Sequence, residues 1–505
     1  MRILGISSGF HDAGVTLIQD GEILFASHSE RYSKEKNDAF LNHDIINEAL
    51  EFGKPDQIVL HEKDWAKKLR NVYAGNWSAL KDKSQEQWIK KFYPQLAGIP
   101  IKSYWHHETH AAAGVLTSDF DECAVMVIDA IGEFDTASIW KWRKGKLVKL
   151  HSIWFPSSLG LFYSAITHHV GLKPMEDEYI LMGMAAYGDV TKAKRLSREM
   201  GKEFFLYPHA WISNKDTIRM KQNLQRGVPK GLFANEDDFD LAMAAQDQVE
   251  KRIMSYGEYA RELTGSTNLV FMGGVALNCV ANSKLFSLGF DNVHIMPNPG
   301  DCGSSLGAAA LHYYNETGNK VNWQGPYLGY NIKGKYPIKK ALASLKKKEL
   351  FGIANGRAEF GPRALGNRSL CADPRGPEVK DQMNVIKKRQ KFRPFAPMIL
   401  EEYVHEYFDM PNNITNAPYM QFVAVCKKPD EFPAIIHEDG TSRVQTVSKT
   451  QHPDLHKLLT AFHKATGCPM LLNTSLNIKG QPIVNDEADA EAFTKKYGVP
   501  VHTSD

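Results

Sequence analysis

The sequence has no long apolar run, no closely paired cysteines and little excess charge. No apolar stretch approaches the ~20 residues needed to span a bilayer, and the N-terminus has no apolar core of signal-peptide length. The six cysteines are far apart, with no CxxC pair, which favours reduced thiols. A formal net charge of +3 over 505 residues argues against an extended nucleic-acid surface but not against a local basic pocket. We therefore expect a cytoplasmic protein with no membrane partner.

The length predicts at least two domains. A strand, a small-residue turn and a hairpin occur twice, about 120 residues apart, which indicates a duplicated unit. This arrangement opens each half of the actin-like ATPase fold, in which a nucleotide lies between two ribonuclease-H-like halves. The predicted strands are 2–7, 13–19 and 22–27 in the first copy, and 124–128, 136–142 and 146–151 in the second.

Two histidines four residues apart, His106 and His110, form a candidate metal site. On a helix they share one face, although lone histidines are usually structural. Asp129 ends the first strand of the second repeat and is the expected third ligand. Asp301, at a strand-to-helix junction, is a fourth ligand, the holder of a metal-bound water, or a simple helix N-cap. Imidazoles with carboxylates suit Fe(II), Mn(II) or Zn(II) better than Ca(II).

Turns rich in small residues carry candidates for a general base and a nucleotide site. His11 lies in the turn after the first strand, where it acts as a general base or only caps the turn. Lys36, in a charged run, lies on a solvated face or reaches a nucleotide phosphate. Gly274 lies between a strand and a helix, where backbone N–H groups favour an anion, and Asn278 is placed to bond a ribose or base.

Residues 356–375 place four arginines among glycines and prolines. Because these residues favour turns, we expect an ordered, tightly turning loop and no regular helix. Guanidinium groups on such a loop grip phosphate or carboxylate, whereas the alternative is a solvated surface loop. The four arginines are Arg357, Arg363, Arg368 and Arg375.

Further basic and amide groups follow in the C-terminal part. Arg393 lies in a proline-bracketed turn, Arg443 in an alternating strand, and Asn473 at the end of an apolar strand. With Arg363 they make one anion pocket, and charge alone does not separate phosphate from carboxylate. Residues 190–240 read as an insertion or lid that shapes an acceptor pocket, and residues 40–100 show no pattern from which we infer chemistry.

Together these motifs resemble the NodU/CmcH family of O-carbamoyltransferases over nearly the whole chain. The motifs that carry the resemblance are Phe10-His-Asp-Ala, His106-His-x-x-His-Ala, Asp129-x-x-Gly-Glu, Gly273-Gly-Val-Ala-Leu-Asn, Gly300-Asp-x-Gly, Gly356-Arg-x-Glu-Phe-Gly-Pro-Arg-Ala-Leu-Gly-Asn-Arg, Phe392-Arg-Pro-Phe-Ala-Pro, Arg443-Val-Gln-Thr-Val and Leu472-Asn-Thr-Ser. One departure is Ile180, where family members often have lysine.

The resemblance implies an actin-like (ASKHA) carbamoyl-transfer domain at 1–330, related to the enzyme of tRNA threonylcarbamoyladenosine synthesis, and a YrdC-like domain at 331–505. The YrdC-like domain is expected to make carbamoyl-adenylate from carbamoyl phosphate and ATP with Mg²⁺. The first domain then moves the carbamoyl group to a hydroxyl acceptor with a bound metal, Fe(II) by resemblance. We also expect a homodimer.

The resemblance also assigns roles to residues. His106, His110, Asp129 and Asp301 would hold the metal, and His11 would deprotonate the acceptor. The adenylate contacts would be Gly274, Asn278 and Lys36, and the carbamoyl phosphate ligands Arg363, Arg393, Arg443 and Asn473. The other arginines of residues 356–375, Arg357, Arg368 and Arg375, would only hold the loop in shape. The alternatives are a threonylcarbamoyl-type transfer to tRNA and a non-catalytic nucleotide- and metal-binding regulator. The sequence leaves the acceptor open among a sugar, an antibiotic and a nucleotide.

Overall fold

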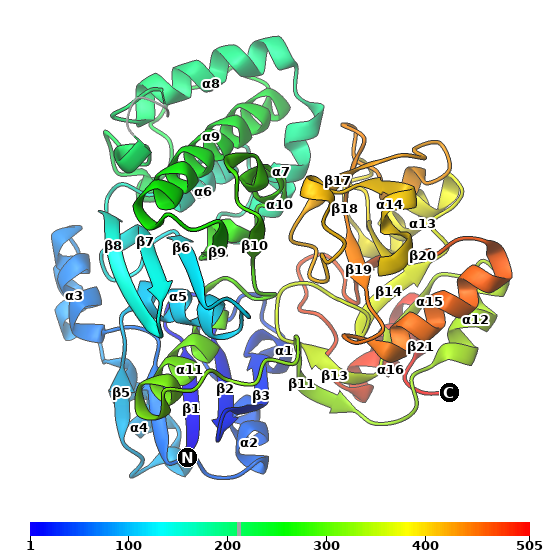
Figure 1. Ribbon diagram of the computed structural model, residues 1–505, viewed down its shortest axis with the longest axis horizontal. Helices are drawn as coiled ribbons and strands as arrows, with labels where there is room; N and C mark the ends of the chain where they lie inside the picture. The colour runs from blue at the N-terminus through cyan, green and yellow to red at the C-terminus, as the bar shows by residue number, and fades with distance from the viewer. Residues whose placement is uncertain (210–213) are drawn as a thin grey trace. The chain divides into compact units, whose positions relative to one another are not determined.

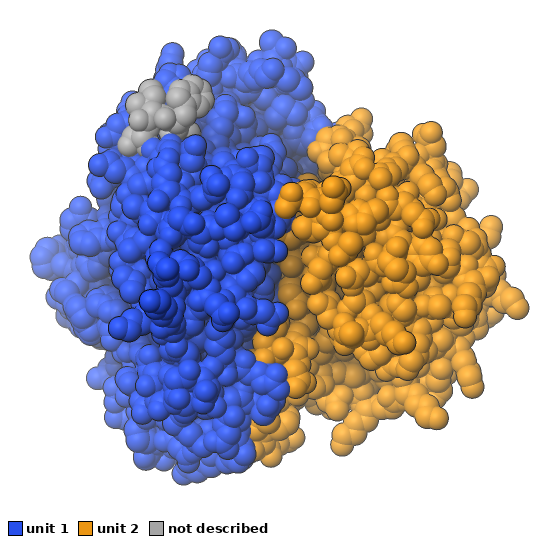
Figure 2. All heavy atoms as spheres, viewed as in Figure 1, with its two compact units in different colours: residues 1–9, 16–22, 53–322 blue, residues 10–15, 23–52, 323–505 orange. Residues whose placement is uncertain are grey.

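The computed structural model describes residues 1–209 and 214–505 and shows a mixed α/β protein (Figure 1). Contacts divide the chain into two compact units (Figure 2). Unit 1 comprises residues 1–9, 16–22 and 53–322, and unit 2 comprises residues 10–15, 23–52 and 323–505. The domain boundary at 330/331 stays a prediction. Among the described residues, no helix is both long and apolar enough to cross a bilayer.

Two five-stranded sheets repeat the same strand order. The first runs β3-β2-β1-β4-β5 and the second β8-β7-β6-β9-β10, so each strand of one sheet has a counterpart in the other. This repetition confirms the duplicated unit predicted from the sequence. The strands are β1 (Arg2–Ser7), β2 (Gly14–Gln19), β3 (Glu22–His28), β4 (Gln57–Leu60), β5 (Ile101–Ser103), β6 (Glu122–Ile128), β7 (Asp135–Arg143), β8 (Lys146–Trp154), β9 (Asn268–Met272) and β10 (Asn292–His294).

Two helices of unit 1 pack on strands of these two sheets. Helix α11 (Ser304–Thr317) packs on β1 and β4, α5 (His106–Leu116) packs on β6 and β9, and the two helices pack on each other (Figure 1). Small residues make this close packing possible, since a Cβ added at Gly307 would lie 1.9 Å from the carbonyl oxygen of Thr109. The ends of α5, β6 and α11 that carry polar side chains therefore converge.

Other helices of unit 1 surround this centre. The long helix α9 packs against α8, which lies within the predicted insertion. Residues 210–213 of that insertion lie outside the described residues. The helices are α3 (Asp64–Tyr73), α4 (Gln85–Phe92), α6 (Leu159–His169), α7 (Glu178–Met184), α8 (Val190–Phe204), α9 (Asp238–Thr264) and α10 (Cys279–Lys284). Ile180, which replaces the usual lysine, is fully buried in α7.

Unit 2 is built on a six-stranded mixed sheet of order β19-β15-β20-β14-β12-β21, with a three-stranded sheet β16-β17-β18 and the pair β11-β13. Its strands are β11 (Tyr327–Ile332), β12 (Phe351–Ala354), β13 (Gly356–Glu359), β14 (Arg368–Ala372), β15 (Ala396–Leu400), β16 (Phe408–Asp409), β17 (Val423–Cys426), β18 (Thr441–Arg443), β19 (Gln445–Val447), β20 (Met470–Ser475) and β21 (Val501–His502). Its helices are α1 (Glu30–Ser33), α2 (His43–Glu51), α12 (Ile338–Lys346), α13 (Glu378–Lys387), α14 (Val404–Tyr407), α15 (Pro453–Thr466) and α16 (Glu487–Tyr497).

The arginine-rich stretch 356–375 is only partly the loop we predicted. Its two ends are the strands β13 and β14, and β14 is a central, fully buried strand of the six-stranded sheet. The turn between them, residues 360–367, is the loop that the glycines and proline produce. The prediction of a loop throughout was wrong because strand pairing outweighs the turn preference of the flanking residues. β13 pairs with β11, and β14 pairs with β12 and β20.

Candidate functional site

Two histidine side chains from one face of α5 meet in unit 1. The Nε2 atoms of His106 and His110 lie 3.1 Å apart, as the four-residue spacing predicts. Both rings are buried. His107, between them, turns the other way, where its Nδ1 lies 2.7 Å from the Ser138 hydroxyl. The sequence therefore predicted correctly that His106 and His110 share one face of the helix.

Two aspartates complete this cluster. Asp129 follows β6, and its Oδ2 lies 3.1 Å from His106 Nε2 and 3.2 Å from His110 Nε2. Asp301 precedes α11, and its Oδ1 lies 3.4 Å from each of the same two nitrogens. The ligand atoms of the four residues all lie within 4.8 Å of one another. Asp301 is therefore part of the cluster, although the sequence alone had left its role open among three alternatives.

The donor set of this cluster suits a divalent metal. Burial opposes protonation of His106, but the carboxylates of Asp301 and Asp129 outweigh it and raise its pKa well above the usual value. Burial and Asp301 oppose ionisation of Asp129, yet hydrogen bonds from the two histidines lower its pKa. Two nitrogens and two anionic oxygens in one buried cluster attract a cation. Two imidazoles with two carboxylates fit Fe(II), Mn(II) or Zn(II).

Backbone groups fix the orientation of the Asp129 carboxylate. Its Oδ1 accepts hydrogen bonds from the backbone N–H groups of Ala130 (2.8 Å) and Gly274 (3.2 Å), so Oδ2 is left for the histidines. A Cβ at Gly274 would lie 3.1 Å from that Oδ1. In this structure Gly274 therefore supports the metal cluster, and its predicted contact with an adenylate stays a prediction.

The amide of Asn278 is fully engaged within unit 1. It exchanges two hydrogen bonds with Gln246, of 3.0 and 2.9 Å, and its Oδ1 also accepts from the backbone N–H of Ala281 at the start of α10. An Asn in this position stabilises the helix N-terminus. The nucleotide contact predicted for Asn278 stays a prediction.

The segment after β4 supplies polar groups that the sequence analysis missed. His61 and Glu62 are buried, and one ligand atom from each lies within 4.8 Å of the other and of one from His106. Glu133, also buried, accepts hydrogen bonds from the backbone N–H groups of His106 and Lys63. The sequence did contain a signal for these residues. A polar His-Glu pair directly follows an apolar strand, at the sheet edge where ligands usually bind.

His11 and Lys36 both belong to unit 2. His11 Nδ1 lies 3.2 Å from Asp12 Oδ2, so the carboxylate orients the imidazole ring. Asp12 adopts a positive φ of 50°, as expected in a tight turn. Lys36 Nζ lies 3.4 Å from Glu30 Oε2 and is partly exposed. The catalytic role of His11 and the nucleotide role of Lys36 stay predictions.

Three arginines of the 356–375 stretch are used by the protein itself. Arg368 is fully buried, and its guanidinium donates to the carbonyls of five residues, namely Tyr330, Asn355, Gly356, Asn367 and Asn485. Arg357 donates to three carbonyls, and Arg375 pairs with Asp373. The contacts of Arg368 and Arg375 agree with the predicted role of holding the loop in shape. Arg357 instead reaches carbonyls of β3 and β11, outside this stretch.

The residues expected to hold an anion all lie in unit 2. Asn473 is buried in β20, and its Nδ2 donates to the Ala364 carbonyl (2.9 Å) and to Gln445 Oε1 (2.7 Å). Its Oδ1 and the Nε of Arg443 are buried and have no hydrogen-bond partner among the described residues. Arg363 and Arg393 are partly buried. Buried, unsatisfied polar atoms favour a ligand.

A basic cluster near these residues contains members that the sequence analysis did not select. Burial, with repulsion from Arg389, Arg393 and Lys36, sets the pKa of Lys387 well below its usual value. Burial also lowers the pKa of His437 to about 4, with smaller contributions from Arg443 and Arg393. Several cationic groups that lie close enough to repel one another favour the binding of an anion between them. The sequence analysis did not select Lys387 because the residues around it have the pattern of the basic C-terminal end of an ordinary helix.

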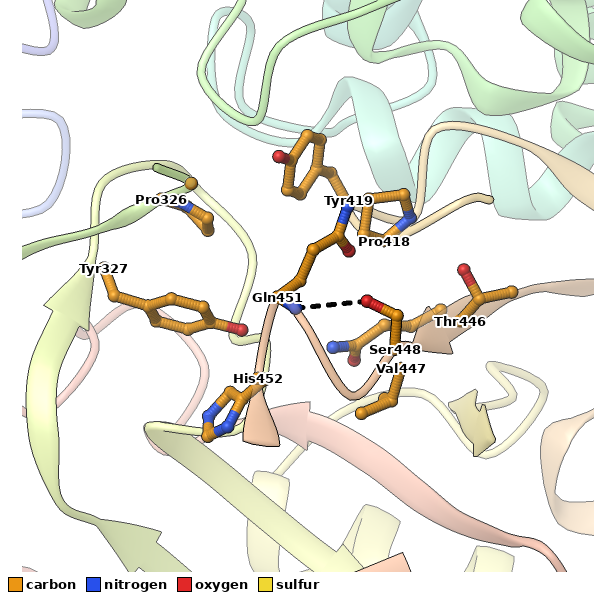
Figure 3. A pocket seen from close by; sticks show the side chains of 11 residues that line it. Pro326, Tyr327, Pro418, Tyr419, Thr446, Val447, Ser448, Gln451 and His452 are labelled. Atoms are coloured by element: carbon orange, nitrogen blue, oxygen red, sulfur yellow. Dashed lines mark hydrogen bonds between the residues drawn. The ribbon is translucent and has the colours of Figure 1, made fainter. Parts of the chain in front are cut away.

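Unit 2 also contains a pocket near this region (Figure 3). Among its lining residues, Gln445 contacts Asn473, and the ring of Tyr327 lies 4.8 Å from that of His452. The lining residues are Gly325, Pro326, Tyr327, Pro418, Tyr419, Gln445, Thr446, Val447, Ser448, Gln451 and His452. None of the predicted site residues is among them, so this pocket is a neighbour of the predicted anion site.

The duplicated α/β fold with a buried cluster of two histidines and two aspartates defines an enzyme-like centre. Comparison with known proteins identifies the family to which the chain belongs. The family model described as Carbamoyltransferase N-terminus matches residues 2–310, and Carbamoyltransferase C-terminus matches residues 342–502. The chain belongs to this carbamoyltransferase family and is a carbamoyl-transferring enzyme.

Relatives cover almost the full length of the chain. Nodulation protein U of Sinorhizobium fredii is 39% identical over 95% of this chain and 94% of its own. The 3'-hydroxymethylcephem-O-carbamoyltransferase of Amycolatopsis lactamdurans is 27% identical over 99% of this chain and 97% of its own. A solved structure, component A of (R)-2-hydroxyglutaryl-CoA dehydratase from Acidaminococcus fermentans, is 15% identical with a TM-score of 0.36, covering 63% of this chain and 100% of its own.

Proposed function

We propose that this carbamoyltransferase acts in two steps, first making carbamoyl-adenylate and then carbamoylating a hydroxyl group of a small molecule. The observation that carries the proposal is the buried His106–His110–Asp129–Asp301 cluster, which lies in the part that matches the carbamoyltransferase N-terminus. A relative named for O-carbamoyl transfer over nearly its full length supports a hydroxyl acceptor.

In the first step, water releases phosphate from carbamoyl phosphate, and the resulting carbamate attacks the α-phosphate of Mg·ATP with loss of pyrophosphate. Carbamoyl phosphate and its phosphate product are small anions, so they need cations and N–H donors. Arg363, Arg393, Arg443 and Asn473 would supply these, and the unsatisfied atoms of Arg443 and Asn473 support this role. Lys36, Gly274 and Asn278 are the proposed contacts to the adenylate.

In the second step, the acceptor oxygen attacks the carbamoyl carbon, and AMP leaves. His11 would take the hydroxyl proton, with the Asp12 carboxylate orienting its ring. His106, His110, Asp129 and Asp301 would hold a divalent metal, with iron our first choice. When bound, such a metal polarises a carbonyl as a Lewis acid. The four ligands are buried, and a buried site would limit the access of water to a reactive carbamoyl group.

The proposal is tested by carbamoyl phosphate-dependent conversion of ATP to AMP and pyrophosphate, with mass spectrometry of the adenylate. Arg363→Ala should lose this conversion and keep the metal. The matched control is Arg195→Ala, which removes an exposed arginine paired with Glu199 and Glu236 and should keep both. Failure of the metal-loaded enzyme to form an adenylate from carbamoyl phosphate would refute the first step. A candidate metabolite that gains one carbamoyl group would then identify the acceptor.

A further inference from the structure

We propose that His61, Glu62 and His106 form a second divalent-metal position, which shares the His106 ring with the first cluster. One ligand atom from each of the three residues lies within 4.8 Å of the others, and all three are buried. The proposal goes beyond carbamoyl transfer. It concerns only unit 1 and is tested by metal content without any substrate.

The two nitrogens of His106 face different surroundings. Its Nε2 lies among His110, Asp129 and Asp301, as described above. Its Nδ1 is buried and has no hydrogen-bond partner among the described residues. The ring of His61 lies 5.3 Å from the ring of His106, and the Nδ1 of His61 is likewise buried without a partner in the described part of the chain. Each of these neighbouring rings thus has one unsatisfied nitrogen, which needs either a water or a cation.

Glu62 supplies the anionic ligand. Lys67 Nζ (2.5 Å) and Gln85 Nε2 (2.8 Å) both donate to its Oε1, so Oε2 is left for a metal. These two bonds also fix the carboxylate, which is the usual role of a supporting group around a metal ligand. Two imidazoles and one carboxylate are a common ligand set for Zn(II), with a fourth position for water.

The backbone holds His61 beside α5 without using its ring. His61 follows β4 directly, its backbone N–H donates to the Ile6 carbonyl (3.1 Å), and its own carbonyl accepts from the Thr109 hydroxyl (3.3 Å). The ring is thus positioned by main-chain bonds on both sides. When both positions are filled, His106 would release its ring proton to solvent, and its imidazolate would bridge the two metals.

Lys67 places a positive charge beside this second position. We therefore expect weaker binding there than in the first cluster, which has two carboxylates. Lys67→Met removes the competing cation and should strengthen binding at the second position only.

The test is a titration of chelator-treated full-length enzyme with Zn(II), read by elemental analysis after gel filtration. Wild type should retain about two equivalents, whereas His61→Ala and Glu62→Gln should each retain about one. His312→Ala is the matched control, because this buried histidine contacts Tyr104 and lies in neither cluster. It should retain the same amount as wild type.

Two further readouts keep the test decisive. Glu62→Gln preserves size, so it answers the question if His61→Ala does not fold by circular dichroism. With Cu(II) in both positions, an imidazolate bridge couples the two spins and suppresses the signal of isolated Cu(II) in electron paramagnetic resonance. A single Zn(II) equivalent in wild type, or a second equivalent that survives both substitutions, would overturn the proposal and leave a buried water as the occupant.

Discussion

His106 and His110 present their Nε2 atoms 3.1 Å apart, and Asp129 Oδ2 lies within 3.2 Å of both. Asp129 is thus the carboxylate nearest to the pair. Asp129→Asn removes its charge but keeps its size, so metal affinity should fall by at least about tenfold. The measurement is a Zn(II) or Fe(II) titration followed by thermal unfolding, since a metal that binds the folded state stabilises it.

Asp121→Asn is the control for this change, because Asp121 is an exposed aspartate just before β6. Its metal affinity and thermal midpoint should equal those of wild type. Equal affinities of the Asp129 and Asp121 variants would show that the cluster does not hold the metal.

Gly307 allows α11 to approach the helix that carries both histidines. An added Cβ would lie 1.9 Å from the Thr109 carbonyl oxygen and 3.0 Å from the Ala113 Cβ, both on α5. Gly307→Ala should therefore destabilise the fold by about 1–3 kcal/mol and weaken metal binding, because α5 must shift. Chemical unfolding and a metal titration measure the two effects.

Gly183→Ala provides the comparison, since Gly183 lies in α7 and an added Cβ meets no atom within 4 Å. Here alanine should be neutral or stabilise by up to about 1 kcal/mol through helix propensity. If Gly307→Ala behaved like Gly183→Ala, close packing of α5 and α11 would not position the metal ligands.

The sequence was most informative where chemistry and local geometry coincide. A four-residue spacing placed His106 and His110 on one face, and a strand end placed Asp129 beside them. The duplicated strand order was also predictable, because each copy repeats a strand, a turn and a hairpin. These features depend on neighbours in the chain.

Features that depend on distant partners were harder to predict. His61, directly after β4, reaches His106 and Thr109 of α5 only through the tertiary fold, since His61 and His106 are more than 40 positions apart. The sequence predicted that the Asn278 amide binds a ligand. In the structure this amide is hydrogen-bonded to Gln246, 32 positions away in the chain. The strand β14 was missed because its pairing with β12 and β20 cannot be read from an arginine- and glycine-rich stretch.

The buried amide pair of Gln246 and Asn278 gives a test of that structural role. Asn278→Ala removes two side-chain hydrogen bonds and the cap of α10, and it leaves Gln246 buried with a lost partner. Unfolding by urea should show a loss of about 2–4 kcal/mol. Asn292→Ala, which removes an exposed amide contact with Asn268, should cost less than about 1 kcal/mol. Equal losses would mean that Asn278 contributes little to the fold and is free for a ligand.

Lys387 predicts how anion binding depends on pH. Burial first, and then repulsion from Arg389, Arg393 and Lys36, lower its pKa well below 10.5 in the folded protein. The folded state therefore disfavours the ammonium form, and this penalty disappears as the pH rises through the folded pKa toward the unfolded value. A bound anion stabilises the ammonium form, so anion affinity should fall as the pH rises through the folded pKa.

Sulfate is a suitable probe because it stays a dianion over the range studied. Calorimetric titration from about pH 6.5 to about pH 9.5 should show a decreasing affinity in wild type. Lys387→Met should bind sulfate more weakly at the low end and show a flatter profile, since its charge is absent throughout. Lys346→Met, which removes an exposed lysine of α12, should keep the wild-type profile. A profile in Lys387→Met as steep as in wild type would assign the pH dependence to another group of unit 2.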